Sequence, residues 1–271
     1  MQTKVEAPAE EPLSVAEASI AVNAVKRRFR ASRRGGGEVE ALAGVSLELP
    51  AGQVLGVVGP SGCGKSTLLE LVAGLQEPNG GTVEVAGASA AERRRAACSY
   101  MPQRDLLLPW RDALDNAGLA LECQGVPRRE ARRRAAPLLE RFGLAGFESS
   151  RPAQLSGGMR QRVAFMRTLL PGRPVLLLDE PFASLDSITR TAMQQWLSDT
   201  LEAEPRTVLM VTHDVEEALF LSDRVAVLSP RPGRVVCELE VPLARPRDRR
   251  AAVTDPELAR LRERALEALG A

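Results

Sequence analysis

A short glycine-rich stretch constrains this chain more than any other part of it. Residues 59–67 read GPSGCGKST, which matches the pattern G-x-x-x-x-G-K-S, and they directly follow the apolar run 53–58. Glycines let the backbone curl until successive N–H groups face one point, and a following helix adds its positive end. The sequence therefore predicts a phosphate-binding loop between a buried strand and a helix over residues 65–74, in an α/β fold.

Composition narrows the class of protein. Lys and Arg total 36 against 35 Asp and Glu, a net charge of +1, whereas a protein that holds nucleic acid through its phosphates is usually more basic. We therefore predict no nucleic-acid partner. The arginine runs at 93–95 and 128–134 are interpreted as solvated helix faces, with an acidic partner surface as the alternative. None of the four cysteines forms a C-x-x-C pair, which argues against a zinc or disulfide framework and fits a reducing cytoplasm.

Three further features of the chain bear on its setting. Residues 1–18 are rich in Glu, Pro and Ala, contain no apolar segment of a signal peptide, and are expected to be disordered. No run approaches the ~18 apolar residues that span a membrane. If the chain acts at a membrane, we therefore expect it to be a peripheral subunit held there by another chain. Cys63 lies inside the phosphate loop and is interpreted as a tolerated small residue rather than a redox switch.

The pattern along the chain is α/β with an insertion. Residues 104–170 are rich in Leu and Arg with a helical period, and predict an inserted helical subdomain whose last helix, 155–170, is capped by Ser156. A basic, glycine-rich segment at 30–37 predicts a mobile hairpin loop. Strands are predicted at 19–30, 45–49, 53–58, 82–85, 175–178, 207–211, 224–228 and 235–241. The resulting division is a segment 1–18, a domain over residues 19–243 and a tail 244–271 that ends in a helix.

Residues at the strand tips supply the expected chemistry. Lys65 would lie against the β- and γ-phosphates, the Ser66 hydroxyl on Mg²⁺, and Thr67 would donate to the α-phosphate. Asp179 ends the apolar run 175–178 and could hold the same Mg²⁺ through water. Glu180 would act as general base on the attacking water. The alternative for this acidic pair is a strand end at a helix N-terminus.

His213 is the only histidine in the chain. It follows the predicted strand 207–211, which places it at the same edge of the sheet as the phosphates. We predict a γ-phosphate contact, with a structural role as the alternative.

A second motif makes the set specific. Residues 155–161 read LSGGMRQ and open a helix, far downstream of the phosphate loop. Together with Gln103 in YMPQ, LLLDEP at 176–181, SLD at 184–186 and His213, they resemble the nucleotide-binding subunit of an ATP-binding-cassette (ABC) transporter over residues 19–243. The resemblance implies a P-loop NTPase fold with a RecA-like mixed sheet, an antiparallel β subdomain and an inserted helical subdomain.

The resemblance also implies roles in a head-to-tail dimer of two copies. Ser156, Gly157 and Gly158 of one copy would bind the γ-phosphate held by the other copy, and Asp186 would link the two sites. Gln103 would touch Mg²⁺ and the attacking water and relay the nucleotide state to a membrane partner. Phe29 would stack on adenine, with a place in the core as the alternative. The loop that holds ATP would comprise Gly59, Pro60, Ser61, Gly62, Cys63, Gly64, Lys65, Ser66 and Thr67.

A single cassette without a membrane span resembles the importer type. Residues 106–110 (LLLPW), 229–235 (SPRPGRV) and the short tail resemble the branch that serves nitrate, sulfonates, taurine and hydroxymethylpyrimidine, a thiamine precursor. The implied partners are a permease that holds the chain at the cytoplasmic face of the membrane and, indirectly, a solute-binding protein. The segment 106–110 is equally consistent with an apolar turn in the helical subdomain and with a permease contact. A non-transport ABC ATPase of DNA repair, chromosome organisation or translation is the alternative class.

Overall fold

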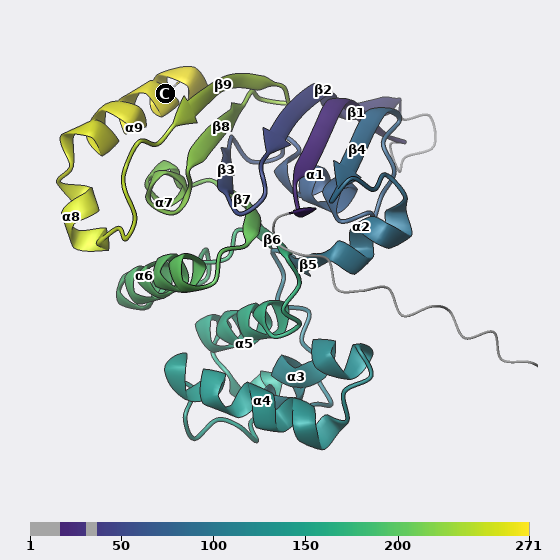
Figure 1. The fold of residues 1–271 in the computed structure, drawn as a ribbon, viewed down its shortest axis with the longest axis vertical. Coiled ribbons are helices and arrows are strands. Elements are labelled where there is room, and N and C mark those ends of the chain that lie inside the picture. Colours follow the sequence, from purple (N-terminus) through teal and green to yellow (C-terminus); the bar gives the residue numbers. More distant parts are fainter. Residues whose placement is uncertain (1–16, 31–36, 271) are drawn as a thin grey trace, which may run out of the picture.

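The computed structural model describes residues 17–30 and 37–270, and has a two-sheet core with a helical lobe beneath it (Figure 1). Two parts of the sequence-based predictions lie outside the described residues. They are residues 1–16 of the segment predicted to be disordered and residues 31–36 of the predicted hairpin loop. This α/β fold, with a mixed sheet, an antiparallel sheet and an inserted helical lobe, confirms the predicted fold class.

The central sheet positions the site. Its strand order is β5-β6-β7-β3-β8-β9, in which only β9 runs antiparallel to its neighbour. The carboxyl ends of β3, β6 and β7 therefore meet at one edge of the sheet. The strands are β3 (Val54–Val58), β5 (Cys98–Met101), β6 (Val175–Asp179), β7 (Thr207–Thr212), β8 (Arg224–Leu228) and β9 (Val235–Glu240). Strand β5 was not predicted, because four residues are too few to show a period.

The antiparallel sheet packs over α1. Its order is β2-β1-β4, with β1 (Ile20–Arg30), β2 (Glu38–Leu49) and β4 (Gly80–Val85). Apolar side chains of this sheet, of α1 (Lys65–Val72) and of one face of the central sheet form a continuous buried cluster. Since burial of apolar area is the main stabilising term in folding, this cluster fixes the antiparallel sheet relative to the phosphate loop.

Helix α2 (Ala91–Ala97) corrects one interpretation of the arginine runs. Arg94 is 1% exposed; its guanidinium donates to the carbonyl oxygen of Val83 and to the Glu77 carboxylate. A solvated role is therefore wrong for Arg94, because a buried guanidinium with paired donors acts as a structural tie. In the second run, Arg128 and Arg132 reach the buried Asp115.

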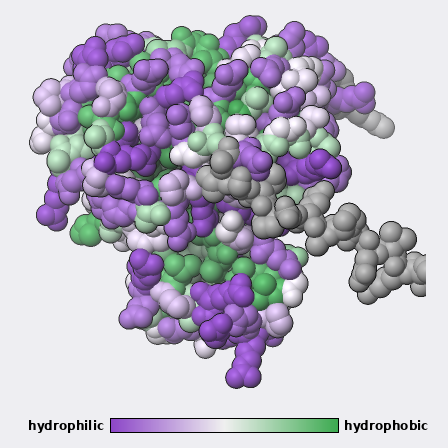
Figure 2. Space-filling model, in the orientation of Figure 1, coloured by the Kyte–Doolittle hydropathy of each residue, from purple (hydrophilic) through white to green (hydrophobic). Residues whose placement is uncertain are grey.

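The helical lobe holds α3 (Ala113–Cys123), α4 (Arg128–Arg141) and α5 (Gly157–Leu169), which lie below the core in Figure 1. Helix α5 begins where the sequence predicts, with Ser156 as its N-cap. Figure 2 shows apolar surface on this lobe within an otherwise largely hydrophilic face. Among the described helices, none combines the length and the apolar run that a bilayer crossing needs.

The last helices pack on the outer side of the central sheet. They are α6 (Ser187–Ala203), α7 (Val215–Leu221), α8 (Arg249–Val253) and α9 (Pro256–Leu269). Arg247, before α8, is 5% exposed and donates to the carbonyl oxygens of Leu219, Phe220 and Ser222. Its guanidinium thus caps the end of α7 and fastens the tail to the core.

Candidate active site

The phosphate loop connects β3 to α1 and is shaped by its lysine. Lys65 is 7% exposed, and its Nζ donates to the carbonyl oxygens of Gly59 at 2.6 Å and Pro60 at 3.1 Å. An ammonium group carries three protons, so one donor remains for a phosphate oxygen. Gly62 and Gly64 have φ angles of +76° and +108°, which residues with a side chain rarely adopt. The loop is therefore curled as the sequence predicts.

Close packing explains Cys63 and its neighbours. A Cβ added at Gly59 would lie 2.8 Å from the Cys63 Sγ, and one at Gly64 would lie 2.6 Å from Leu42 Cδ2. Burial raises the pKa of the Cys63 thiol, which disfavours the reactive thiolate. These contacts agree with the interpretation of Cys63 as a packed small residue.

Asp179 and Ser66 come together at the tips of adjacent elements. Asp179 is 2% exposed, and its pKa is raised to about 6, chiefly by burial. The nearby carboxylates of Glu180 and Glu70 act in the same direction on this pKa, whereas the Ser66 hydroxyl beside the carboxylate and the Lys65 ammonium act to lower it. Mg²⁺ binds oxygen ligands and usually coordinates one or two carboxylates together with substrate phosphates. The neighbouring Ser66 hydroxyl and Asp179 carboxylate therefore fit this ion.

Glu180 and His213 also come together. The His213 Nδ1 lies 2.8 Å from Glu180 Oε2, because Glu180 directly follows β6 and His213 directly follows the neighbouring β7. The Glu180 side chain is 14% exposed and that of His213 is 60% exposed. Glu180 has a φ of +48° and its N–H donates to the Val211 carbonyl oxygen. Strain of this kind in a residue with a side chain is typical of functional sites.

The start of α5 has open space beside its first glycine. Ser156 Oγ accepts from the N–H of Met159 at 3.2 Å. A Cβ added at Gly157 would have only the Arg160 guanidinium near it, at 3.9 Å, and one at Gly158 would be 3.4 Å from Leu185. Packing within the chain therefore does not require glycine at 157, whereas close approach of a second molecule would.

Asp186 has a local role in this chain. Its carboxylate accepts from the N–H of Thr189 and caps α6, and these hydrogen bonds lower its pKa. Gln103 is exposed and shares a hollow with Gly157, Arg160 and Ser184 rather than with Ser66. Its predicted contact with Mg²⁺ stays a prediction.

Phe29 lies in β1, opposite Val39 of β2, and is half-buried. The Arg27 guanidinium lies 4.7 Å from the centre of its ring. Arg27 is itself held by Gln76 and by the carbonyl oxygen of Glu77. One face of the ring is thus occupied by a cation, and adenine stacking by Phe29 stays a prediction.

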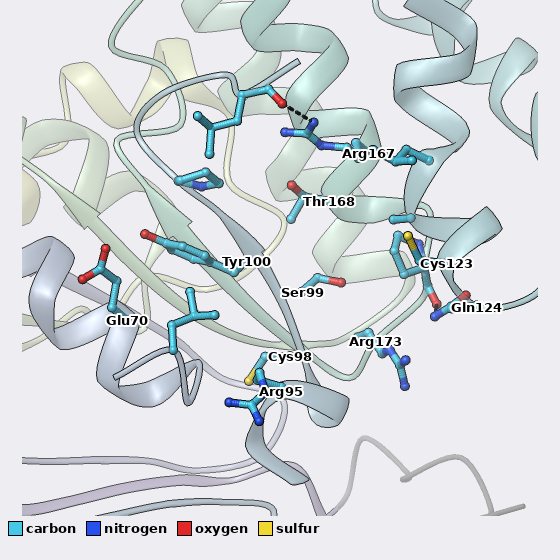
Figure 3. A pocket seen from close by; sticks show the side chains of 16 residues that line it. Glu70, Arg95, Cys98, Ser99, Tyr100, Cys123, Gln124, Arg167, Thr168 and Arg173 are labelled. Carbon is cyan, nitrogen blue, oxygen red and sulfur yellow. Dashed lines mark hydrogen bonds between the residues drawn. The ribbon is translucent and has the colours of Figure 1, made fainter. Parts of the chain in front are cut away.

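A groove of about 680 Å³ separates the core from the helical lobe. In Figure 3, Glu70 and Tyr100 line its core side, while Arg167 and Thr168 of α5 line the other. Leu106, which lines the groove, is 58% exposed, and Trp110, four residues further along the chain, is 70% exposed. Leu107 between them is buried, so the turn 106–110 both packs into the lobe and presents apolar side chains outward.

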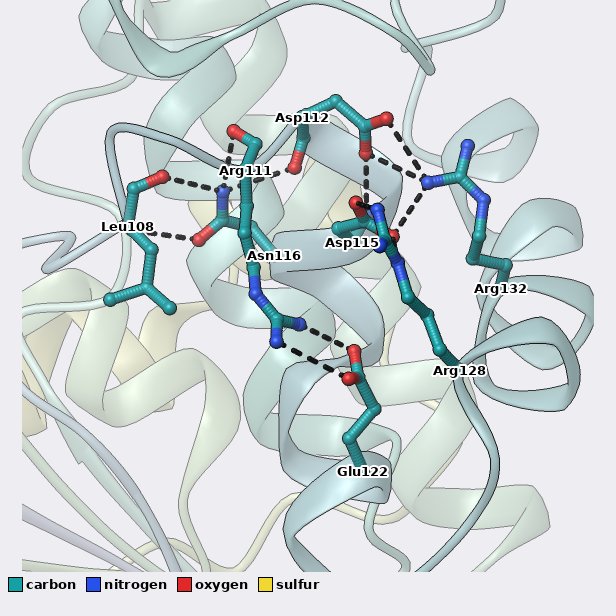
Figure 4. A network of polar contacts seen from close by, with 8 residues as sticks. All are labelled: Leu108, Arg111, Asp112, Asp115, Asn116, Glu122, Arg128 and Arg132. Carbon is teal, nitrogen blue, oxygen red and sulfur yellow. Dashed lines mark hydrogen bonds and ion pairs between the residues drawn. The ribbon is translucent and has the colours of Figure 1, made fainter.

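Two residues that the sequence did not single out hold this turn. Asn116 is fully buried; its amide donates to the carbonyl oxygens of Leu108, Arg111 and Asp112 and accepts from the N–H of Leu108 (Figure 4). Arg167 of α5 donates to the carbonyl oxygens at 105 and 106. Neither residue belongs to a periodic pattern or motif, so only their place in the fold shows the role.

Comparisons with known proteins agree with this geometry. The model of the family described as "ABC transporter" matches residues 42–183. The aliphatic sulfonates import ATP-binding protein SsuB 1 of Rhodococcus jostii is 48% identical over 83% of this chain and 85% of its own length. The formylaminopyrimidine import ATP-binding protein ThiZ of Halalkalibacterium halodurans is 48% identical over 70% of this chain and 74% of its own.

A third relative and a solved structure complete the comparison. The taurine import ATP-binding protein TauB of Rhizobium johnstonii is 43% identical over 85% of this chain and 89% of its own length. The dimeric post-hydrolysis structure of the cassette MJ0796 bound to ADP and Pi is 30% identical, with a TM-score of 0.75 over 83% of this chain and 100% of that one. The chain therefore belongs to the ABC transporter family, as an ATP-binding subunit that hydrolyses ATP.

Proposed function

We propose that two copies of this chain pack head to tail around two ATP molecules and drive import of a small solute through a separate permease. In each site, Lys65 and the phosphate loop of one copy hold the triphosphate, while Ser156, Gly157 and Gly158 of the other copy cover the γ-phosphate. A helix N-terminus with free N–H groups suits that anion. The absence of a packing reason for glycine at 157 supports this arrangement.

The observation that carries the hydrolytic role is the contact between Glu180 and His213. Glu180, at the tip of β6, is placed to take a proton from water that attacks the γ-phosphate in line. His213 holds the Glu180 carboxylate through Nδ1 and keeps its other ring nitrogen for a phosphate oxygen. Both groups stand next to Asp179, in a site whose charges act through partly desolvated surroundings.

Magnesium fits the same edge of the sheet. Ser66 and Asp179 would hold the ion, and Gln103 would join them when the two copies close. The ion would offset the charge of the β- and γ-phosphates when bound. Asp186 would connect the two sites through the dimer interface, in addition to its local role as a helix cap.

The groove beside β5 is the proposed permease contact. Leu106 lines the groove and Trp110 lies in the same segment 106–110; both expose apolar area, while Asn116 and Arg167 fix that segment. A rigid, exposed aromatic anchor is the usual centre of a protein interface. Arg167 belongs to α5, the helix that Ser156 caps. Movement of the turn would therefore be transmitted through Arg167 and α5 to Ser156. Binding to the permease would place the chain at the cytoplasmic face of the membrane.

The proposed cargo is a small organic solute of the sulfonate, taurine or pyrimidine kind, since relatives at 43–48% identity are named as import ATP-binding proteins for aliphatic sulfonates, taurine and formylaminopyrimidine. A solute-binding protein would select the solute outside the membrane and act on this chain only through the permease. No nucleic acid takes part in this proposal. A non-transport ABC ATPase is the competing function.

The proposal is tested by co-purification from the source cells in mild detergent. The Glu180→Gln chain should bring down a multi-span membrane protein, and adding Trp110→Ala should reduce that yield severalfold. Phe147→Ala is the matched control, because Phe147 is another exposed aromatic of the helical lobe, 40% exposed, and lies outside the segment 106–110. Recovery of ribosomal or nucleic-acid material in place of a membrane protein would favour the non-transport class.

A further inference from the structure

We propose that Gly233 is a positioning residue for the phosphate loop, holding the Cys63–Gly64 peptide in the orientation that binds polyphosphate. Gly233 lies in the hairpin between β8 and β9, far from residues 59–67 in sequence. The inference rests on the proposed function only in that the loop must bind the phosphates of ATP.

The hairpin is tied to the antiparallel sheet through Gly233. The N–H of Gly233 donates to the carbonyl oxygen of Ala41 at 2.8 Å, and its own carbonyl oxygen accepts from the N–H of Ala43 at 3.0 Å. The pairing makes a short parallel bridge between Gly233 and Leu42 of β2. Two hydrogen bonds to a strand within a buried cluster leave this backbone little freedom to move away.

The phosphate loop packs directly against this bridge. A Cβ added at Gly233 would lie 2.2 Å from the Cys63 carbonyl oxygen, well inside any allowed contact, and the atom met belongs to the backbone. The φ of Gly233 lies outside the left-handed region, so conformation does not explain glycine here. Glycine is required because the Cys63 carbonyl approaches too closely for a side chain.

Leu42 closes the other side of the same peptide. Its Cδ2 lies 2.6 Å from the position of a Cβ on Gly64 and 3.3 Å from that of a Cβ on Gly233. Leu42 is fully buried. The Cys63–Gly64 peptide is thus clamped between β2 and the hairpin, and both sides of the clamp need glycine.

This clamp has a consequence for phosphate binding. A peptide group is planar, so the direction of the Cys63 carbonyl sets the opposite direction of the Gly64 N–H. The Gly64 N–H is one of the donors that the curled loop turns toward an anion. A side chain at 233 would push the Cys63 carbonyl and rotate that donor away from its target.

Ser229 stiffens the hairpin that carries Gly233. Its Oγ lies within hydrogen-bonding distance of the Pro230 and Pro232 carbonyl oxygens and accepts from the N–H of Arg234. Ser229 is only half-buried, so its replacement tests the hairpin with little disturbance of the core.

The test compares Gly233→Ala with wild type and with Gly80→Ala. A Cβ at Gly80 meets nothing closer than 3.9 Å, which makes it the matched control. Dissociation constants for ATP and for inorganic tripolyphosphate are measured on the full chain, beside the thermal midpoint. We expect Gly233→Ala to weaken both ligands on the order of tenfold or more, since displacements of about 1 Å carry such effects. Ser229→Ala should weaken both severalfold with an unchanged midpoint, and Gly80→Ala neither.

The outcomes separate this proposal from the proposed function. Wild type that binds neither ligand would defeat the phosphate-loop assignment itself. Wild type that binds both, with folded Gly233→Ala and Ser229→Ala binding equally well, would overturn the positioning role alone. Weaker binding of ATP with unchanged binding of tripolyphosphate would also overturn the positioning role, because the effect would then concern the part of the site that binds adenine. If Gly233→Ala does not fold, Ser229→Ala decides by the same comparison.

Discussion

His213 and Glu180 touch across two neighbouring strands, with the imidazole Nδ1 2.8 Å from a carboxylate oxygen. The two residues are separated by 33 positions in sequence but follow β6 and β7, whose parallel pairing brings Asp179 opposite Val211. The proposed general base is thus in contact with the residue that we propose to bind the γ-phosphate.

Glu180→Gln should abolish proton transfer while keeping the shape of the site. We expect kcat for ATP to fall about 10²- to 10⁴-fold, the usual contribution of a general base. ATP affinity should hold, and the ATP-bound dimer should accumulate on size-exclusion chromatography. Glu202→Gln, an exposed glutamate of α6, is the control and should retain wild-type turnover. Near-normal turnover of Glu180→Gln would move the base elsewhere.

His213→Ala tests whether the two groups act as a unit. Single variants at contacting residues are non-additive, with coupling of about 0.5–3 kcal/mol. We therefore expect the double variant His213→Ala with Glu180→Gln to hydrolyse ATP little more slowly than Glu180→Gln alone. Steady-state kcat for the four proteins of this cycle gives the coupling. Fully additive losses would show that the contact has no part in turnover.

Mixing two inactive variants tests the shared site. Lys65→Ala should lose ATP binding, and Ser156→Arg should bind ATP as a monomer but not turn it over. A mixed dimer of the two contains one site with wild-type Lys65 and wild-type Ser156, if the site is built from two copies. Activity should therefore reappear on mixing, measured by phosphate release. A mixture that stays inactive would argue for a site within one copy.

Phe29→Ala separates adenine binding from phosphate binding. Loss of a stacked base costs about 1–3 kcal/mol, so we expect the dissociation constant for ATP to rise roughly 5- to 150-fold. Affinity for inorganic tripolyphosphate, which has no base, should stay at the wild-type value. Equal loss for both ligands would place Phe29 in the core rather than in the nucleotide site.

Glu217 should make stability depend on pH. It is 3% exposed in α7, and burial raises its pKa to about 7. Within that value Asp214 acts in the same direction as burial, whereas Thr212, Gln194 and Arg190 act to lower the pKa. Because the folded pKa exceeds the ordinary value of 4.5, folding favours the protonated acid. The contribution of Glu217 to the free energy of unfolding is fully present below pH 4.5 and is lost as the pH rises through about 7.

Glu217→Gln removes that titration. The thermal midpoint of the variant, relative to wild type, should therefore rise between pH 5 and pH 8. A change of a few degrees is expected, since about 1 kcal/mol shifts the midpoint of a domain of this size by about 2–4 °C. A midpoint difference that is flat across this range would show that Glu217 does not change charge there. Glu84→Gln, on exposed strand surface, is the control.

The sequence by itself predicted the parts of the site that are contiguous along the chain. The loop 59–67, the pair Asp179–Glu180 and the helix that begins after Ser156 all lie in motifs whose local backbone is shaped by a few adjacent residues. Strand–loop–helix order then placed His213 at the right edge, because parallel strands end on one side. Most core strands were found for the same reason, since each buried run is apolar.

Only the tertiary structure decided which distant groups meet. The buried Arg94, the Asn116 amide inside its turn and Gly233 against Cys63 each depend on packing between segments that no local pattern connects. The four-residue β5 exists because its neighbour β6 supplies hydrogen bonds, and its own residues show no period. Local sequence thus determined the curled loop and the residues at the strand tips, whereas close packing of remote backbone determined which segments lie against them.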